Sequence, residues 1–432
     1  MKKNIYILIF TLCTSFGFAQ QTPASKQSKP IAITGATAHL GNGEVIENSL
    51  IIFKDGKLTT VSSGSQVDLS GMEVINATGK HVYPGFIAPS STLGLGEIDS
   101  VKASVDESEI GEMNPHIRSI VAYNAESKIV ESMRPNGVLM GQIAPQGGRI
   151  AGTSTVVQFD AWNWEDATVK VNDGIHLNWP SSFTRGRWWL GEDPGLKIND
   201  KYSEQIDDVT SFFNETKAYS AGDKGTVNLP YAATQGLFDG SKKLYINVDN
   251  EKGITDAIHF AKNNKVQHMV IVGGSESYKV ADLLKQNNIP VIIQRVHSLP
   301  GHEDEDYDLP YKLAKLLVDK GVMVALNANG QMERMNTRNL PFYAGTVVAH
   351  GLDKEEALKL ITSNTAKILG IDKNYGTLEE GKSATLFISE GDALDMRTNQ
   401  LTHAFIDGRL ISLETHQTEL WKRYDGKFKA QK

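Results

Sequence analysis

A short apolar segment that follows a Pro-Gly pair constrains the fold of this chain more than any other stretch. Pro84 and Gly85 are typical of a turn, and the residues from Phe86 onward then have the composition of a buried β-strand. Two hydroxyl residues, Ser90 and Thr92, lie two positions apart near the end of this strand. Alternate residues of a strand project from the same face, so these two hydroxyls are expected to point toward one common place.

The segment resembles the first barrel strand of the amidohydrolase superfamily, which contains imidazolonepropionase-like and cyclic-amidase-like metal hydrolases. In that family the phrase is Pro-Gly-Phe-Ile-Asp, one small residue, and then His-x-His, whose two imidazoles bind one metal ion. Residues 84–87 match this phrase, but Ala88 stands at the aspartate position, and Ser90 and Thr92 stand at the two histidine positions. A hydroxyl is a poor zinc ligand beside imidazole, thiolate or carboxylate. The motif is therefore expected to be degenerate.

Two segments near the C-terminal end are similar to the same family. Residues 376–386 read Gly-Thr-Leu-Glu-Glu-Gly-Lys-Ser-Ala-Thr-Leu, which resembles the family's Gly-x-Leu-x-x-Gly-Lys-x-Ala-Asp-Leu. Asp353 and Glu356 have the spacing of a helix capping box, and the helical pattern after them ends at Gly370. With the first strand, these segments extend the resemblance over most of the chain.

Strand and helix patterns alternate through the middle of the chain, for example from the apolar run at 244–248 to the run at 322–326. This alternation favours a parallel sheet with helices outside, but it does not distinguish a barrel from a doubly wound sheet. The resemblance implies a (β/α)₈ TIM-like barrel over residues 84–375, which is long enough for a barrel of typically about 250 residues with insertions. Residues 172–226 do not fit the alternation and are expected to be an insertion, whose tryptophans cover the barrel mouth or stack on a ligand or partner.

The sequence pattern at the two chain ends is typical of short strands. Asp55-Gly56 and Asp407-Gly408 each stand between strand-like runs, which predicts two β-hairpins. The resemblance implies that residues 31–83 and 376–415 join into one composite β-sandwich beside the barrel.

The first residues have the pattern of a secretory signal peptide. A basic start precedes an apolar run at 5–16, and small residues then lead to Ala19 and Gln20, near which cleavage is expected. Residues 1–19 would be the signal peptide, and the polar residues 20–30 a flexible leader. We therefore expect a periplasmic or secreted protein.

The composition argues against a membrane span, disulfide bonds and a nucleic-acid partner. The apolar run is too short to span a bilayer comfortably, so no transmembrane segment is expected in the mature form. The only cysteine of the 432 residues, Cys13, lies inside the predicted signal, so the mature protein would lack disulfides and thiol ligands. A net charge of −7 without a basic block argues against nucleic acid.

The resemblance implies five metal-ligand positions at the carboxyl ends of the barrel strands. Besides Ser90 and Thr92, the histidine of the fifth strand falls on Asn247 and that of the sixth on Gly273. The aspartate after the eighth strand, which is ligand and general base at once, falls on Asn329. An amide cannot take a proton from water as a carboxylate can. We therefore expect no metal at these positions and no cofactor, with Ser90, Thr92, Asn247 and Asn329 left as polar groups of a substrate pocket.

Two histidines offer a different chemistry. His297 and His302 follow a predicted strand and stand next to the acidic run 303–306. Imidazole beside carboxylates could bind zinc or another divalent ion, or His297 could act as a base without a metal. Acidic loop runs are more often simply solvated.

These observations leave three functional hypotheses open. The first is an exported hydrolase of C–N bonds in cyclic amides or peptide-like compounds, as the family implies. The second is a catalytically degenerate relative that binds a small molecule, or that pairs with itself or with a catalytic amidohydrolase. The third is a metal-free hydrolase that uses His297. The catalytic residues themselves are not identified by the sequence.

Overall fold

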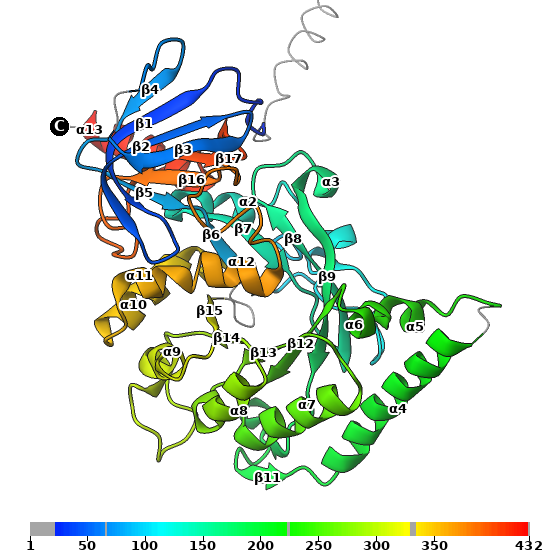
Figure 1. Ribbon diagram of the computed structural model, residues 1–432. Helices are drawn as coiled ribbons and strands as arrows, with labels where there is room; N and C mark the ends of the chain where they lie inside the picture. The colour runs from blue at the N-terminus through cyan, green and yellow to red at the C-terminus, as the bar shows by residue number, and fades with distance from the viewer. Residues whose placement is uncertain (1–21, 65–66, 223–224, 329–333, 431–432) are drawn as a thin grey trace, which may run out of the picture.

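The computed structural model describes residues 22–64, 67–222, 225–328 and 334–430. The predicted signal peptide and Asn329 lie outside these ranges. In the described residues, one sheet is built from both chain ends and lies beside a larger barrel-like body made from the middle of the chain (Figure 1).

The end sheet has eight strands in the order β18-β17-β16-β5-β1-β2-β3, and β4 pairs with β1. The two ends of the chain meet where β5 pairs antiparallel with β16. The strands are β1 Ile31–His39, β2 Val45–Lys54, β3 Lys57–Ser63, β4 Glu73–Asn76, β5 His81–Pro84, β16 Leu386–Ser389, β17 Leu401–Ile406 and β18 Arg409–Leu410. The ends thus form a composite unit, but it is one mixed sheet, and the predicted two-layered sandwich is not confirmed.

Both predicted hairpins are present. Asp55 and Gly56 have φ angles of 51° and 77° between β2 and β3, and Asp407 and Gly408 have φ angles of 48° and 72° between β17 and β18. Positive φ at both central residues is the mark of the tight turns that match the twist of a hairpin. Asp-Gly pairs adopt it readily because glycine has no Cβ.

Part of the predicted leader is tied to the folded protein. The Ala24 N–H donates to Asp160 Oδ2 at 2.9 Å, and its carbonyl accepts from Arg409 at 3.3 Å. The Gln27 side chain donates to the Phe53 carbonyl at 2.9 Å and accepts from the Gly56 N–H at 3.1 Å.

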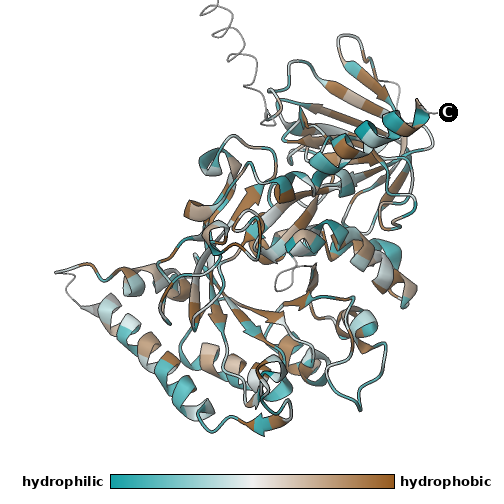
Figure 2. Cartoon of the chain, turned by 180° about the vertical axis from the view of Figure 1, so that it is seen from behind, coloured by the Kyte–Doolittle hydropathy of each residue, from teal (hydrophilic) through white to brown (hydrophobic). Residues whose placement is uncertain are grey.

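The second sheet also has eight strands, in the order β15-β14-β13-β12-β9-β8-β7-β6. The two end strands of this order, β6 and β15, contact one another, so the sheet curls into a nearly closed barrel. Its buried strands form the largest apolar core of the described chain, and Figure 2 draws them mainly in the hydrophobic colour. The strands are β6 Phe86–Ser91, β7 Val138–Ile143, β8 Ile150–Gln158, β9 Thr168–Asn178, β12 Lys243–Val248, β13 Met269–Gly273, β14 Val291–Gln294 and β15 Val324–Asn327.

One strand departs from the predicted all-parallel barrel. β8 runs antiparallel to both of its neighbours, β7 and β9, whereas the other pairs are parallel. Only residues 144–149 join β7 to β8, and parallel strands need a crossover of a dozen or more residues. The glycine-rich turn there, with Gly147 and Gly148 at φ angles of 80° and 58°, therefore forces the reversal.

Helices cover the second half of the barrel. α7 buries an apolar face that includes Ile254, Ala257 and Ile258, and the Asn250 side chain caps its first turn. The described helices are α2 Lys128–Glu131, α3 Trp164–Ala167, α4 Tyr202–Ala221, α5 Leu229–Thr234, α6 Gly236–Asp239, α7 Glu251–Asn263, α8 Ala281–Gln286, α9 Leu309–Asp319, α10 Leu340–Ala349, α11 Lys354–Lys359, α12 Ser363–Leu369 and α13 His416–Lys429. The 3₁₀ turns are η1 Lys102–Ser104, η2 Ser119–Ala122, η3 Arg134–Asn136, η4 Trp188–Leu190, η5 Ser277–Val280 and η6 Arg334–Asn339. No helix among the described residues is both long and apolar enough to cross a membrane.

The predicted helix signals near the C-terminal end are largely confirmed. Asp353 accepts hydrogen bonds from the N–H groups of Glu355 and Glu356 and so caps α11. The Glu356 side chain pairs with Lys359 and does not reach back to the cap, so the reciprocal half of the predicted box is missing. Gly370 ends α12 with a φ angle of 69°.

The predicted insertion begins later than residue 172, because residues up to Asn178 form the end of β9. A two-stranded sheet of β10 Phe183–Arg185 and β11 Leu196–Ile198 follows, and then α4. Trp179 is buried and donates to the Tyr202 hydroxyl at 3.1 Å. Trp188 and Trp189 are 71% and 64% exposed, so these two tryptophans do not form a packed cover over the barrel.

Gly85 is the point where the chain passes from the end sheet to the barrel. Its N–H donates to the Thr385 carbonyl at 3.0 Å. A Cβ at this position would lie 2.9 Å from Thr385 Cγ2 and 3.0 Å from Leu139 Cδ1, closer than real side chains approach. Residues of both sheets therefore pack directly against the Gly85 backbone, where there is no room for a side chain.

Replacement of Gly85 by alanine is expected to destabilise the protein by roughly 1–3 kcal/mol, because the added methyl group overpacks the junction. A Cβ on Gly426, in α13, would meet no other atom within 4 Å, so Gly426→Ala is the matched control and should leave stability unchanged or slightly raised. Urea unfolding of the two variants checks this. Equal midpoints for the two variants would contradict the close approach at Gly85.

Candidate functional site

Ser90 lies at the tip of the first barrel strand and is held by side chains from both sides. Its N–H donates to Gln142 Oε1 of β7 at 2.9 Å, and its carbonyl accepts from Asn327 Nδ2 of β15 at 3.0 Å. The backbone there has a φ angle of 48°, which is strained for serine and persists because both neighbours fix it. Asn327 thereby links the two strands at which the barrel closes.

A chain of polar side chains continues from Ser90 across the barrel. Gln142 Nε2 donates to Asp173 Oδ2 at 2.8 Å, although β7 and β9 are separated by β8. A direct bond between strands that are not neighbours requires the concave side of the sheet, so these groups lie inside the barrel. Ser154 donates to Asp173 Oδ1 at 2.8 Å and the Tyr245 hydroxyl donates to Asp173 Oδ2 at 3.0 Å. We call these residues, with Ser90, the inner polar network.

Burial controls the charges of this network. Asp173 is 1% exposed, and burial raises the pKa of its carboxyl, while the hydrogen bonds from Ser154, Tyr245 and Gln142 oppose that rise. Burial lowers the pKa of His176 to about 3, so its imidazole is neutral. This ring stacks on Tyr245 with centroids 4.8 Å apart, and within the described chain its Nε2 atom has no hydrogen-bond partner.

Asn247, the predicted ligand position of the fifth strand, is bonded to a neighbouring strand tip. Its Nδ2 donates to Asn178 Oδ1 at the end of β9 at 3.0 Å. Asn178 in turn donates to the Gly148 carbonyl at 2.8 Å. Two amide side chains thus occupy the tips of the fourth and fifth barrel strands. They form a hydrogen bond with each other, and Asn178 also forms one with the turn between β7 and β8.

Gly273 ends β13 with a φ angle of 93°. A Cβ there would lie 2.6 Å from Asp249 Oδ1, so a histidine could not stand at this position without displacing that aspartate. Asp249 follows β12 and was not identified from the sequence. It lines a cavity of about 310 Å³ beside the tips of β13 and β14, together with Arg295 and Glu305.

His297 is not brought to the other predicted residues. Its Nε2 bonds Thr346 Oγ1 of α10 at 2.7 Å, and its ring packs on Tyr343 with centroids 4.3 Å apart. Partial burial lowers the pKa of this histidine. The strand tips of β6, β9 and β12 therefore receive no base from His297.

His302 does lie beside carboxylates. Ligand atoms of Glu276, His302 and Glu305 lie within 4.8 Å of one another, and this is the group of three that could hold a metal ion among the described residues. Competing partners engage the two acids. Glu276 pairs with Lys279 at 2.7 Å and accepts the Glu251 N–H at 2.6 Å, and Glu305 accepts the Gly301 N–H at 2.7 Å.

A buried arginine holds the segment that follows the first strand. Arg334 is 2% exposed, and its Nη2 lies 2.8 Å from Asp99 Oδ1 and 2.7 Å from Glu107 Oε2. A Cβ on Gly96 would lie 2.1 Å from Nη1 of this guanidinium, so a larger residue there would displace the guanidinium. Ser90 and Thr92 are only 8% and 3% exposed, which makes them a buried floor rather than an open pocket wall.

The predicted ligand positions that the structure describes do not fit a metal ion of the family type. Ser90, Thr92, Asn247 and Gly273 supply neither imidazole nor carboxylate, and hydrogen bonds to other protein groups already engage the Asn247 amide and the Ser90 backbone. Asn329 lies outside the described residues.

The sequence interpretation missed Asp173 and Tyr245, which form the centre of the inner polar network, and His176, whose ring stacks on Tyr245. The signal was present. Polar and small residues alternate with Ile175 and Leu177 from 174 to 178, as in a strand with one face inside a barrel. Residues 174–178 fall inside the insertion that the sequence analysis predicts from residue 172 onward, so they were not assigned to a strand.

Known proteins with similar sequences are amidohydrolases and deaminases. The model of the Amidohydrolase family matches residues 314–411. An imidazolonepropionase of Flavobacterium johnsoniae is 21% identical over 415 residues, which cover 87% of this chain and 94% of that protein. An adenine deaminase of Clostridium botulinum is 21% identical over 391 residues, which cover 88% of this chain and 57% of that protein.

Solved structures share the fold. The crystal structure of an amidohydrolase from Thermotoga maritima has a TM-score of 0.77 at 22% identity and covers 88% of this chain and 99% of its own. A molinate hydrolase has a TM-score of 0.56 at 14% identity and covers 92% of this chain. The shared fold supports the TIM-like barrel. From the family match, the relatives and this fold, we conclude that the chain belongs to the amidohydrolase superfamily.

Proposed function

We propose that this chain is an exported amidohydrolase-superfamily protein that has lost metal-dependent C–N hydrolysis and binds a small polar molecule at the strand tips. One observation carries this proposal: residues at the family's ligand positions bond to neighbouring neutral groups, the Asn247 amide to Asn178 and the Ser90 backbone carbonyl to Asn327. A water molecule there would have neither a cation to lower its pKa nor a carboxylate to take its proton.

The cavity beside β13 and β14 supports the binding half of the proposal. Its volume of about 310 Å³ is at the lower end of the range for small-molecule sites. Arg295 offers a cation, and Asp249 and Glu305 offer anions, so a ligand that carries both an amino and a carboxyl group matches the lining. An amino acid or a dipeptide-like compound has this chemistry. Pairing with a second copy or with a catalytic relative is compatible with it and stays a prediction.

A second candidate function is hydrolysis with a metal bound at Glu276, His302 and Glu305. The favouring observation is the approach of these three ligand atoms within 4.8 Å at the loops that follow β13 and β14. Against it stands the ion pair between Glu276 and Lys279, which a cation would have to displace.

Metal content and turnover distinguish the two candidates. Protein purified with zinc or manganese present is expected to retain less than about one metal ion in ten chains and to hydrolyse no member of an amide and dipeptide panel. Some zwitterionic members should raise its melting temperature, since a ligand that binds only the folded state stabilises it.

Metal binding and turnover at the second candidate site would give a different result. Stoichiometric metal that is lost in His302→Ala but retained in His297→Ala, together with chelator-sensitive turnover, would replace the first candidate by the second. His297 is the matched control because it lies on the same loop but bonds to Thr346 of α10.

We further propose that the inner polar network replaces a bound metal as the feature that holds the barrel strands together, from Ser90 at the strand tips to Asp173 near the start of β12. The network joins β15, β6, β7, β8, β9 and β12 through side chains of Asn327, Gln142, Ser154, Asp173 and Tyr245. Asp173 accepts three hydrogen bonds at its centre. The inner polar network would then maintain the arrangement of the barrel strands, and the burial of the Asp173 carboxyl group would be its energetic cost.

The pH dependence of stability tests this role. Because the pKa of Asp173 is raised on folding, the buried carboxyl costs least at low pH, and the native state loses stability as pH rises from the ordinary carboxyl pKa to the folded one. Asp173→Asn removes this titration and can donate to Ser154, which already donates to the Gly174 carbonyl. In urea unfolding, the variant should gain on the parent between pH 4.5 and pH 8 by about 1.4 kcal/mol for each unit of pKa shift.

Asp200→Asn is the control for loss of charge alone, since Asp200 is exposed. Its difference from the parent should stay constant over the same pH range. If the parent gains on Asp173→Asn as pH rises, the ionised carboxylate is the favoured form and the proposed cost is absent.

Export is proposed from the first residues of the sequence. Expression in a bacterial host with an outer membrane should deliver the chain to the periplasm with Gln20 as its first residue. Intact-mass measurement of the periplasmic fraction checks the cleavage. A full-length chain found only in the cytoplasm would refute the proposal.

A further inference from the structure

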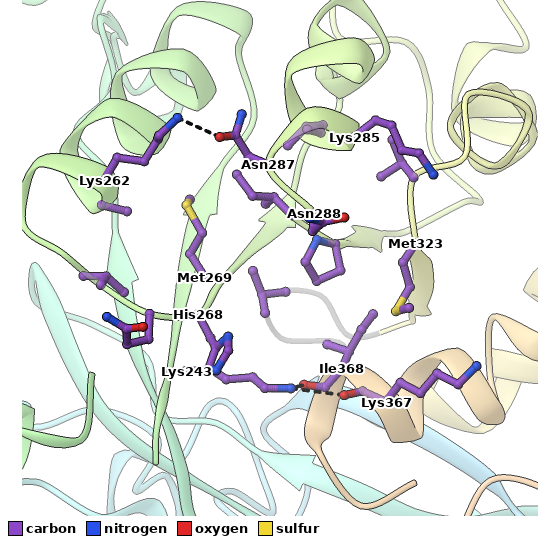
Figure 3. Close-up of a pocket in the computed structure, with 18 of the residues that line it drawn as sticks. Lys243, Lys262, His268, Met269, Lys285, Asn287, Asn288, Met323, Lys367 and Ile368 are labelled. Atoms are coloured by element: carbon purple, nitrogen blue, oxygen red, sulfur yellow. Dashed lines mark hydrogen bonds between the residues drawn. The ribbon is translucent and has the colours of Figure 1, made fainter. Parts of the chain in front are cut away.

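A second cavity lies at the opposite end of the barrel from the strand tips. Its lining includes Lys243 and Met269, the first residues of β12 and β13, and Pro290 and Met323, which directly precede β14 and β15. Its volume of about 690 Å³ is within the range of small-molecule sites and about twice that of the cavity beside β13 and β14. We call it the basal cavity (Figure 3).

The charged residues of the basal cavity are all basic. Four lysines and one histidine are among its nineteen lining residues, all of them in the described part of the chain, and none of the nineteen is aspartate or glutamate. The chain as a whole has 51 acidic against 44 basic residues, so this sign is not a reflection of composition. The basic residues are Lys243, Lys262, Lys285, Lys367 and His268.

Neutral oxygens are the hydrogen-bond partners of three of these lysines. Lys262 donates to the amide oxygen of Asn287 at 2.8 Å, and Lys285 donates to the carbonyl of Gly321 at 2.9 Å. Lys243 donates to the carbonyls of Lys367 and Ile368 at the end of α12. The end of α12 carries a partial negative charge, which Lys243 and Lys170 complement, but none of these partners is a carboxylate.

Burial makes that charge costly at one of the four positions. Desolvation, aided by the like charge of Lys170, lowers the pKa of Lys243 to about 8, while Asp173 and Asp372 act against the fall. An anion in the cavity would offset this penalty. Lys262, Lys285 and Lys367 are exposed and stand around the opening in Figure 3, where they add a positive field without such a cost.

The remaining wall of the basal cavity is apolar. Met269, Met323 and Val266 offer partly exposed side chains, and Pro290 and Ile368 close the lining between them. Met323 is 40% exposed, so its side chain is accessible to a ligand. Methionine side chains adapt to ligands of different shape. An apolar wall with a basic rim matches a molecule that has an apolar body and an acidic head.

We propose that the basal cavity binds an amphipathic organic carboxylate, whose acidic group meets the positive field of the lysines in the lining and whose apolar body packs against Met269 and Met323. This proposal is independent of the function proposed for the strand tips, because no residue lines both cavities. The site lies on the barrel face that the family's catalytic groups do not use.

Calorimetric titration of the full mature chain tests the proposal. The probes are decanoate, decanol, decyltrimethylammonium and inorganic phosphate, each below its aggregation limit. Decanoate is expected to bind at least ten times more tightly than the other three, and its affinity should fall several-fold between 50 and 300 mM NaCl, because salt screens the rim.

Variants locate the site. Lys285→Gln combined with Lys367→Gln should weaken decanoate at least tenfold, whereas Lys373→Gln, which removes an exposed lysine just after α12, should not change it. Met323→Trp should fill the cavity and block decanoate, and an unchanged melting temperature without ligand shows that the variant is folded.

Three outcomes would overturn the proposal. Decanol that binds as tightly as decanoate would show an apolar site without anion recognition. Phosphate that binds as tightly would show a site for inorganic anions. Decanoate binding that survives both the double lysine variant and Met323→Trp, or no decanoate binding at all, would show that the cavity is not the site.

Discussion

The buried carboxyl group of Asp173 is the constraint on which the barrel interior depends. Removing a carboxyl group from water is expensive unless hydrogen bonds replace the lost hydration. Gln142, Ser154 and Tyr245 supply those bonds from three different strands, and Gln142 also fixes the backbone of Ser90. The register of these strands is therefore coupled, because a one-residue slip of any of them would turn its polar side chain away from the carboxyl.

This coupling gives a physical account of a barrel without the family's ligands. In a metal hydrolase the cation gathers side chains from distant strands onto one point. Here amide, hydroxyl and carboxyl side chains, together with the Ser90 backbone, join β15, β6, β7, β8, β9 and β12 directly. We infer that this network retains the arrangement of the barrel strands, and the ligand positions that the structure describes carry neither imidazole nor carboxylate. The proposed loss of metal-dependent hydrolysis is compatible with the shared fold, since function belongs to the site and not to the scaffold.

The two ends of the barrel differ in charge. At the strand tips, Arg334 is buried between Asp99 and Glu107, and the cavity beside β13 and β14 carries both signs of charge. At the base, lysines gather without acids around the larger cavity, where several helices end. Lysines near helix C-termini complement the helix dipoles, so part of this charge belongs to the fold, and the remainder is available to an anion. The end sheet takes no part in either cavity.

The sequence by itself determined the local elements and the family frame. Asp-Gly turns, the helix stop at Gly370 and the first strand follow from short-range rules, which depend on neighbours in the chain, and the loss of histidine at Ser90 and Thr92 follows from the family resemblance. The tertiary structure alone decided which distant groups meet. In the structure, β8 runs antiparallel to its neighbours, and Asp173 and His176 belong to a barrel strand and not to the predicted insertion. His297 bonds to α10, and lysines from four separate elements line the basal cavity. Such contacts join residues far apart in sequence, and only the three-dimensional packing of the strands and helices sets which of them come within bonding distance.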